Sequence, residues 1–306
     1  MQLILGFRAA GVTLHAGIGR SQALRRAIGL LGPGDGFVWV GINGRFAVPW
    51  TTLRRRGVRT VYYQTEPIYL AAGAPCVRYN KSVGMVSKID ELWDFSHHNL
   101  EVCGGATARG GVDQPEGAPG RPQPPPSKGA KPLTIRLIPP GYMPTAHRVE
   151  GTSSALLFFG AIDATTGRGP CYYLLKRSLG EQLHQTYSVW NDSALMRVFE
   201  RYDLYLNLHK RCAPGGPVTF RHALLLSAGK LVLSDRAHPR DEAEYAGMVR
   251  FVPQARLAEE YRAMVLGSDY RAEQRRAHER FRTRFQPEAI FHRAGVYRDW
   301  GLRLSS

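Results

Sequence analysis

The chain has 306 residues, 43% of them hydrophobic, and a formal net charge of +16 at pH 7. This length can bury the cores of two domains, and no uninterrupted apolar run approaches the roughly 20 residues of a membrane helix. Lys and Arg outnumber Asp and Glu by 41 to 25, which favours anionic partners such as nucleic acid, phosphorylated sugars or acidic membrane surfaces. The composition therefore fits a soluble enzyme.

Strands and a helix alternate in the first part of the chain and predict one Rossmann-like half. We expect strands at residues 1–7, 37–42 and 58–63, and an amphipathic helix at 21–31 that Ser21 can cap. The N-terminal order of apolar residues before Arg8 is not that of a signal peptide, so a buried first strand is the interpretation.

A Gly- and Pro-rich segment, residues 104–132, follows with almost no apolar content. It cannot bury enough surface to offset the entropy of ordering, so we expect an exposed, disordered insertion. The strand pattern resumes at 135–138, which places this insertion inside the first domain. We therefore predict an N-terminal domain at 1–148.

The second domain is expected at 149–280, with a tail, 281–306, that packs back toward the first domain. Its clearest pattern comprises strands at 204–208, 231–233 and 249–252, with a Gly/Pro turn at 213–217 and a helical run at 220–228. Strands that alternate with helices predict a parallel sheet. Ligands of such sheets bind beyond the carboxyl ends of the strands, and those ends here carry a run of polar residues: Asn207, His209, Lys210, Arg211, Ser234, Asp235 and Arg236.

The four cysteines are far apart and form no C-x-x-C pair: Cys76, Cys103, Cys171 and Cys212. We therefore expect neither a zinc site nor a disulfide framework. His97 and His98 have no further ligand-type residues at regular spacing, so they are poor evidence for a metal. A reducing, cytoplasmic location is the expectation.

Five segments in collinear order resemble the GT-B glycosyltransferases, which have two Rossmann domains. They read VYYQTEP, KIDELWDFSHHNL, IPPGYMP, LLFFGAIDATTGR, and NLH followed by AGKLVLSD. The resemblance implies an α/β chain with two Rossmann-like domains facing across a cleft. It also implies transfer of a hexose or related sugar from a nucleoside-diphosphate sugar, of UDP or GDP type, to a hydroxyl of a glycan or another acceptor.

Several residues are candidates for binding the donor phosphates. Gly160 opens a loop that ends at Arg168, which could form a bidentate phosphate contact, although an ordinary flexible loop is an equal alternative. The resemblance places Arg221 at a helix start facing the donor phosphates, against the alternative of a surface salt bridge. Asn207, His209 and Lys210 could contact phosphate or ribose.

Acidic side chains are candidates for the ribose hydroxyls, because a carboxylate can accept two hydrogen bonds from a cis-diol. Asp235, Glu242 and Glu244 follow the strand expected at 231–233. For contact with the ribose, the resemblance favours Glu242 or Glu244. The pair of Glu residues seven or eight apart that is familiar in retaining relatives is not reproduced near Arg221.

The first domain should supply the acceptor side. A loop with Gly17 and Gly19 precedes the first helix and resembles the acceptor-side loop that faces the donor, although a plain turn is as good an interpretation. Glu66, at a strand end, is the first choice for a general base, and Asp94, His15 and His97 are its rivals. Glu66 could equally anchor a loop through backbone N–H groups.

No Asp-x-Asp motif occurs in the chain, which favours stabilising the leaving diphosphate without a metal or other cofactor, by cationic side chains, N–H groups and helix N-termini. The arginines at 271–284 predict either a solvated helix or contact with an anionic surface. Two other classes stay open: a nucleic-acid-binding protein, although no known motif is present, and a catalytically silent glycan-binding protein with the same fold.

Overall fold

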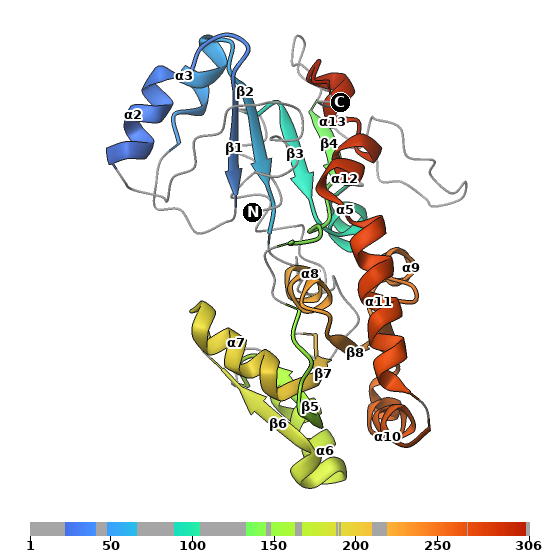
Figure 1. Ribbon diagram of the computed structural model, residues 1–306. Coiled ribbons are helices and arrows are strands. Elements are labelled where there is room, and N and C mark those ends of the chain that lie inside the picture. The colour runs from blue at the N-terminus through green and yellow to red at the C-terminus, as the bar shows by residue number, and fades with distance from the viewer. Residues whose placement is uncertain are drawn as a thin grey trace, which may run out of the picture. The chain divides into compact units, whose positions relative to one another are not determined.

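A computed structural model of the chain contains two parallel β-sheets, one of four strands and one of five (Figure 1). The structure describes residues 22–40, 48–65, 89–104, 133–144, 148–162, 167–187, 189, 191–209, 219–267 and 269–303. Of these, residues 140–296 form one compact unit, and residues 22–139 with 297–303 form the other.

The four-stranded sheet belongs to the unit of residues 22–139 and 297–303. Its strand order is β1-β2-β3-β4, and every neighbouring pair is parallel. The strands are β1 (Gly36–Val40), β2 (Arg59–Tyr63), β3 (Glu91–Asp94) and β4 (Thr134–Leu137); the helices are α2 (Gln22–Leu30), α3 (Trp50–Arg55) and α5 (His97–Gly104). The expected helix at 21–31 and strands at 37–42 and 58–63 correspond to α2, β1 and β2 within two residues wherever the chain is described.

One apolar cluster holds α2 and α3 against this sheet. Ile28 of α2 and Leu53 of α3 pack with Phe37 of β1 and Tyr62 of β2. Phe37 meets the ring of Trp50 edge-on, with 5.7 Å between the ring centroids. Burial of these side chains fixes which face of each helix turns toward the core.

The five-stranded sheet belongs to the unit of residues 140–296, and its order is β6-β5-β7-β8-β9 with all pairs parallel. The strands are β5 (Ser153–Phe159), β6 (Leu183–Thr186), β7 (Tyr202–Asn207), β8 (Leu231–Asp235) and β9 (Val249–Val252). Its helices are α6 (Gly169–Leu179), α7 (Asp192–Arg201), α8 (Thr219–Ser227), α9 (Pro239–Glu244), α10 (Leu257–Gly267), α11 (Tyr270–Arg284) and α12 (Pro287–Arg293).

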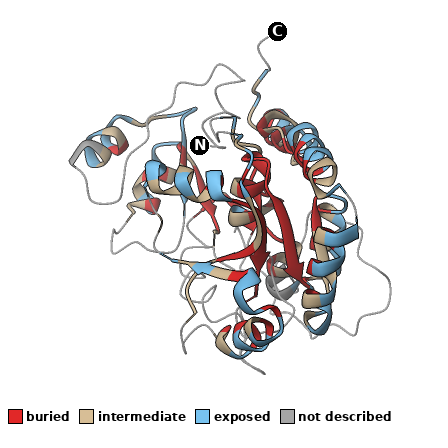
Figure 2. Ribbon diagram, turned by 60° about the horizontal axis from the view of Figure 1, so that its bottom comes forward, coloured by how far each residue is buried: buried red, intermediate tan, exposed pale blue. Residues whose placement is uncertain are grey.

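Strands β7 and β8 are buried along their whole length, as Figure 2 shows by their red colour. Such continuous burial is typical of parallel strands that helices cover on both faces. The apolar sequence of β8 agrees with burial on both faces. The helix predicted at 220–228 corresponds to α8. The predicted parallel sheet in this half is confirmed.

A buried lysine ties the amino end of this sheet together. Lys230 is fully buried, and its Nζ donates to Val149 O and Phe199 O at 2.6 Å and to Asp203 Oδ1 at 3.2 Å. Gln274 of α11 donates to the same Asp203 oxygen at 3.0 Å. Three donor contacts satisfy the ammonium group, as burial of a charge requires.

Helices α11 and α12, which we expected to lie partly in a separate tail, belong to the unit of residues 140–296. Phe281 and Phe285 stack at 4.7 Å between centroids, and Phe285 stacks on Tyr245 at 5.0 Å. Ile290 and Phe291 of α12 are buried as well. These aromatic and aliphatic contacts explain why the chain stays with this unit as far as residue 296.

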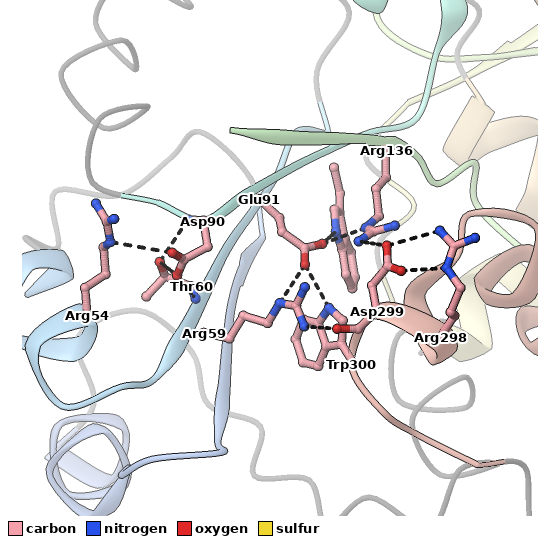
Figure 3. Close-up of polar contacts among 10 residues, drawn as sticks. Arg54, Arg59, Thr60, Asp90, Glu91, Arg136, Arg298, Asp299 and Trp300 are labelled. Atoms are coloured by element: carbon pink, nitrogen blue, oxygen red, sulfur yellow. Dashed lines mark hydrogen bonds and ion pairs between the residues drawn. The ribbon is translucent and has the colours of Figure 1, made fainter. Parts of the chain in front are cut away.

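The last described residues return to the four-stranded sheet through a buried carboxylate (Figure 3). Glu91 is 1% exposed and accepts from Arg136 Nε and Trp93 Nε1 at 2.7 Å and from Trp300 Nε1 at 2.9 Å. Arg59 Nε lies 2.7 Å from the same carboxylate. Two guanidinium groups therefore compensate one buried charge, two indole N–H groups donate to it as well, and one of these four donors comes from the C-terminal segment.

Asp299 extends this network. Its Oδ2 accepts from Arg136 Nη2 at 2.8 Å, and its Oδ1 accepts from Arg298 Nε at 2.7 Å. The hydrogen bonds from Arg298 and Arg136 lower the pKa of Asp299 to about 2. Because the ordinary Asp pKa is about 3.9, this carboxylate stabilises the folded chain above about pH 4 and loses that effect as the pH falls toward 2.

We predict that Asp299→Asn lowers the urea midpoint at pH 7 and that its difference from the wild type shrinks as the pH falls from about 4 toward 2. Urea titrations at several pH values measure this difference. Glu181→Gln is the matched control, because Glu181 is 98% exposed and its carboxylate lies 3.9 Å from Lys176 Nζ, which is too far for a hydrogen bond. A deficit of the Asp299 variant that stays constant with pH would contradict this linkage.

Candidate functional site

Polar side chains gather at the carboxyl edge of the five-stranded sheet. Asn207 ends β7, and the register pairs it with Ser234 in β8, whose last residue is Asp235. His209 follows β7 by two residues, and Gly160 follows β5 directly. The parallel register thus brings together these residues, as the sequence predicted.

Arg221 is the third residue of α8 and points at this edge. Its Nη1 donates to Asn207 Oδ1 at 3.1 Å. A Cβ atom added to Gly160 would lie 3.3 Å from Arg221 Nη2, so a larger residue at position 160 would crowd the guanidinium group. Gly160 and Arg221, two candidates from the sequence for binding the donor phosphates, therefore lie side by side in the structure.

A chain of hydrogen bonds fixes the amide of Asn207. Asn207 is fully buried, its Nδ2 donates to Ser234 Oγ at 3.0 Å, and Ser234 Oγ donates to Asp235 O at 2.9 Å. With Nδ2 engaged, Oδ1 faces Arg221, which is a donor only. A buried hydrogen-bond network therefore orients the guanidinium group of Arg221.

His209 and Asp235 form a buried pair beside this network. His209 Nδ1 lies 2.5 Å from Asp235 Oδ1, and the backbone N–H of His209 donates to both carboxylate oxygens at 3.1 and 3.2 Å. The carboxylate accepts only, so Nδ1 carries the proton. His209 Nε2 is buried and has no hydrogen-bond partner within the described part of the chain.

Arg168 precedes α6 and is 5% exposed. Its Nε donates to Leu208 O at 2.9 Å. Arg168 is therefore attached to the backbone that follows β7, one residue from His209. This attachment places a second guanidinium group at the carboxyl edge.

Two residues of α8 that the sequence did not single out also face this region. Thr219 Oγ1 is buried without a partner among the residues described. His222 is fully buried, neither of its ring nitrogens has a partner in the described ranges, and the rings of Tyr245 and Phe251 meet it edge-on. The signal that could have found His222 is a lone titratable residue in the apolar run FRHALLL.

Burial makes the His222 imidazole neutral. Desolvation lowers its pKa well below the ordinary 6.5, and electrostatic interactions with His209 and Arg221 lower this pKa further. A histidine that is neutral when folded but protonates when unfolded contributes stability above about pH 6.5. That contribution is lost progressively as the pH falls below this value, because only the unfolded chain takes up the proton.

We predict that His222→Leu reduces the loss of stability between about pH 7 and pH 5, because the variant has no imidazole to protonate in the unfolded chain. At pH 7 the change should be small, since an apolar group replaces an unpartnered polar one. Urea unfolding at both pH values measures it, with His292→Gln at an exposed position as control. An acid sensitivity equal to that of the wild type would refute the assignment.

The two glutamates proposed for the ribose already contact groups of the protein. Glu242 Oε1 accepts from Ala237 N at 2.7 Å, and its Oε2 lies 2.7 Å from Arg236 Nη2. Glu244 accepts from Arg284 Nη2 at 3.0 Å, and Arg293 lies 3.8 Å from it. Their role in donor binding stays a prediction.

Asp94, a rival for the general base, closes the turn from β3 into α5. It is fully buried, and its Oδ1 accepts from Ser96 N at 3.1 Å and from Asn99 Nδ2 at 3.0 Å. This contact pattern is that of a turn-anchoring residue. His97, another rival, is the first residue of α5 and is half-buried. Four further residues of the acceptor side and one of the donor side lie outside the described residues: Glu66, His15, Gly17, Gly19 and Lys210.

The cysteines correct one expectation. Cys171, in the first turn of α6, is disulfide-bonded, so the expectation of no disulfide framework is wrong at this position. Spacing along the chain could not reveal the pair, because a disulfide depends on proximity in the fold. A cytoplasmic location stays a prediction.

Across the described ranges, no three His, Cys, Asp or Glu residues are grouped so that they could hold a metal ion. No helix in these ranges is long and apolar enough to span a membrane. In the Arg-rich stretch 271–284, four arginines are in ion pairs, namely Arg271 with Glu150, Arg275 with Asp269, Arg282 with Glu279 and Arg284 with Glu244. Contact of this stretch with an anionic surface stays a prediction.

No protein-family model matches the chain, and no curated protein matches its sequence. Solved structures are similar in fold. An α,α-trehalose-phosphate synthase (UDP-forming) from Burkholderia xenovorans is 13% identical, with a TM-score of 0.57 over 91% of this chain and 76% of that one. HepE from Anabaena, in complex with UDP-glucose, is 11% identical, with a TM-score of 0.53 over 81% and 74%.

Sucrose-phosphate synthase from Thermosynechococcus elongatus is 13% identical, with a TM-score of 0.51 over 81% of this chain and 69% of that one. At such identities the likeness defines the fold. The chain has the GT-B fold, an α/β architecture with two Rossmann-like units, and this sequence prediction is confirmed.

Proposed function

We propose that the chain is a glycosyltransferase that moves a hexose or related sugar from a nucleoside-diphosphate sugar to a hydroxyl of a glycan or another acceptor. The observation that carries the proposal is Arg221, which the Asn207 amide orients at the carboxyl edge of a parallel sheet. The GT-B fold and the UDP-glucose bound by the similar HepE support this donor class.

The first turn of α8 suits the diphosphate of the leaving group. A helix N-terminus carries N–H groups and a partial positive charge that favour anions. The helix has nine residues, its first residue is Thr219 with the buried, unpartnered hydroxyl described above, and Arg221 adds a formal charge. Preorganised groups of this kind stabilise the negative charge that develops as the sugar leaves.

We further propose that the donor is of UDP or GDP type and binds without a metal ion. Two guanidinium groups, those of Arg168 and Arg221, lie at the same edge and can neutralise the diphosphate. The buried His209–Asp235 pair holds the backbone after β7 through two contacts to one N–H group.

Glu66 is proposed as the general base that deprotonates the acceptor hydroxyl. Its rival Asp94 already accepts two hydrogen bonds in the turn before α5, and His15 and His97 are the other candidates. Deprotonation of the hydroxyl generates the nucleophile, which attacks the anomeric carbon as the bond to the diphosphate breaks.

We predict that Arg221→Ala weakens the binding of UDP or GDP roughly ten- to a hundredfold, because one charge-assisted contact to phosphate is lost. Calorimetric titration in excess chelator measures the affinity and tests metal independence together. Arg262→Ala is the matched control, since Arg262 is exposed in the same unit and donates to Ser178 O. Binding that appears only after magnesium or manganese is added would contradict the metal-free proposal.

We predict that Glu66→Gln retains donor affinity, while the rate of sugar transfer falls by about 10²–10⁴-fold, because the variant keeps its shape but loses the base. Turnover of a panel of UDP- and GDP-sugars with glycan acceptors measures the rate. Normal turnover in this variant would make Asp94 the next candidate. Donor binding by the wild-type chain without any turnover would favour the silent glycan-binding alternative.

A further inference from the structure

A group of exposed arginines that lies outside the candidate site occurs on α2 and at the end of α3. Residues 22–65 contain seven arginines, no lysine or glutamate and a single aspartate, Asp35. The side chains that form the outer surface are exposed, and we call them the α2–α3 surface: Arg25, Arg26, Leu30, Arg55 and Arg56.

Helix α2 has two distinct faces. Ile28 is buried in the apolar cluster of the four-stranded sheet and Leu24 packs against it, whereas Arg25, Arg26 and Leu30 are exposed. These positions follow from 3.6 residues per turn, because residues 24 and 28 share one face and residues 26 and 30 share another. The arginines therefore project away from the sheet.

The two helices form one surface. Arg56 Nη1, just after α3, donates to Gly29 O in the last turn of α2 at 3.1 Å. Leu53 of α3 and Ile28 of α2 lie in the same apolar cluster, and Figure 1 shows both helices at the β1–β2 side of the sheet. Arg55 and Arg56 therefore extend the charge of Arg25 and Arg26.

Among the residues that the structure describes, no acid forms an ion pair with an arginine of this surface. The carboxylate of Asp35 accepts from Gly32 N at 2.8 Å within its own turn. Asp90 lies 3.6 Å from Arg54, which is half-buried and outside the α2–α3 surface (Figure 3). Arginines on α11 differ, because several of them face acids.

We infer that the α2–α3 surface binds an anionic lipid bilayer. Arginines near a negatively charged leaflet are attracted to it. Leu30 is 85% exposed and lies among these arginines at the end of α2. An apolar side chain in a basic surface can enter the acyl boundary while the guanidinium groups contact the head groups.

A lipid surface fits these residues better than single-stranded nucleic acid does. Single-stranded nucleic acid is bound by aromatic side chains on which bases stack. The aromatic residues next to this surface turn inward, since Phe37 is 7% exposed and Trp50 is 5% exposed. The exposed apolar residue is an aliphatic one, Leu30, which offers no stacking platform.

The test uses the full chain and vesicles of phosphatidylcholine with and without phosphatidylglycerol. Binding should require phosphatidylglycerol and weaken at high salt. Arg25→Gln with Arg26→Gln should weaken binding about thirtyfold, since each basic residue near the surface contributes a factor of about five. The matched control is Arg275→Gln with Arg276→Gln, an exposed arginine pair on α11, which should bind as the wild type does.

A second pair of variants tests the apolar contact. Leu30→Ser should weaken binding by roughly tenfold. Leu266→Ser should not, although Leu266 on α10 is 83% exposed and therefore equally accessible. Unchanged urea midpoints would show that each variant folds, as expected for exposed positions.

Three outcomes would overturn the inference. In the first, the chain does not bind phosphatidylglycerol vesicles. In the second, both double arginine variants lose the same vesicle affinity. In the third, single-stranded nucleic acid binds through Arg25 and Arg26 and displaces the chain from the vesicles. The inference does not depend on the proposed transferase activity, because vesicle binding is measured without donor or acceptor.

Discussion

The parallel register between β7 and β8 is the constraint on which the donor-side site depends. It pairs Asn207 with Ser234 and so places His209 beside Asp235. Side chains alternate between the two faces of a strand, so a slip by one residue would turn every one of these groups to the opposite face. The apolar residues of both strands are buried, and their burial holds the register.

The two units solve the same problem of burying charge in different ways. In the five-stranded unit, the ammonium group of Lys230 finds backbone carbonyls and one carboxylate. In the four-stranded unit, the carboxylate of Glu91 finds two guanidinium and two indole donors. Lys230 directly precedes β8, at the amino end of its sheet, and Glu91 is the first residue of β3. In the five-stranded unit, the buried charge and the candidate site therefore lie at opposite ends of the strands.

Much of the fold could be predicted from the sequence, because it depends on local periodicity. The strand expected at 249–252 has the same bounds in the structure, and the helix expected at 220–228 differs by one residue at each end. The collinear motifs also predicted the GT-B fold. Strand β6, with the sequence LHQT, has too little apolar pattern to be recognised, and only its pairing with β5 defines it.

The site could be predicted only where strand ends define it. Asn207, His209, Arg221 and Asp235 come together because parallel strands end at one edge. Glu242 and Glu244 were chosen by position along the chain, which does not reveal that Arg236 and Arg284 lie beside them. His222 was overlooked because a histidine in an apolar helix is not distinguished from a core residue until its two unsatisfied nitrogens are seen.

The return of the C-terminal segment to the four-stranded sheet has a consequence for the order of folding during synthesis. Glu91 and Arg136 leave the ribosome long before Asp299 and Trp300, which complete their contacts. Until then, the nascent four-stranded unit carries an incompletely compensated carboxylate. Residues 140–296 are all made before that segment, so their sheet can form first. The N-terminal unit is therefore synthesised first but is the last to acquire its complete polar network.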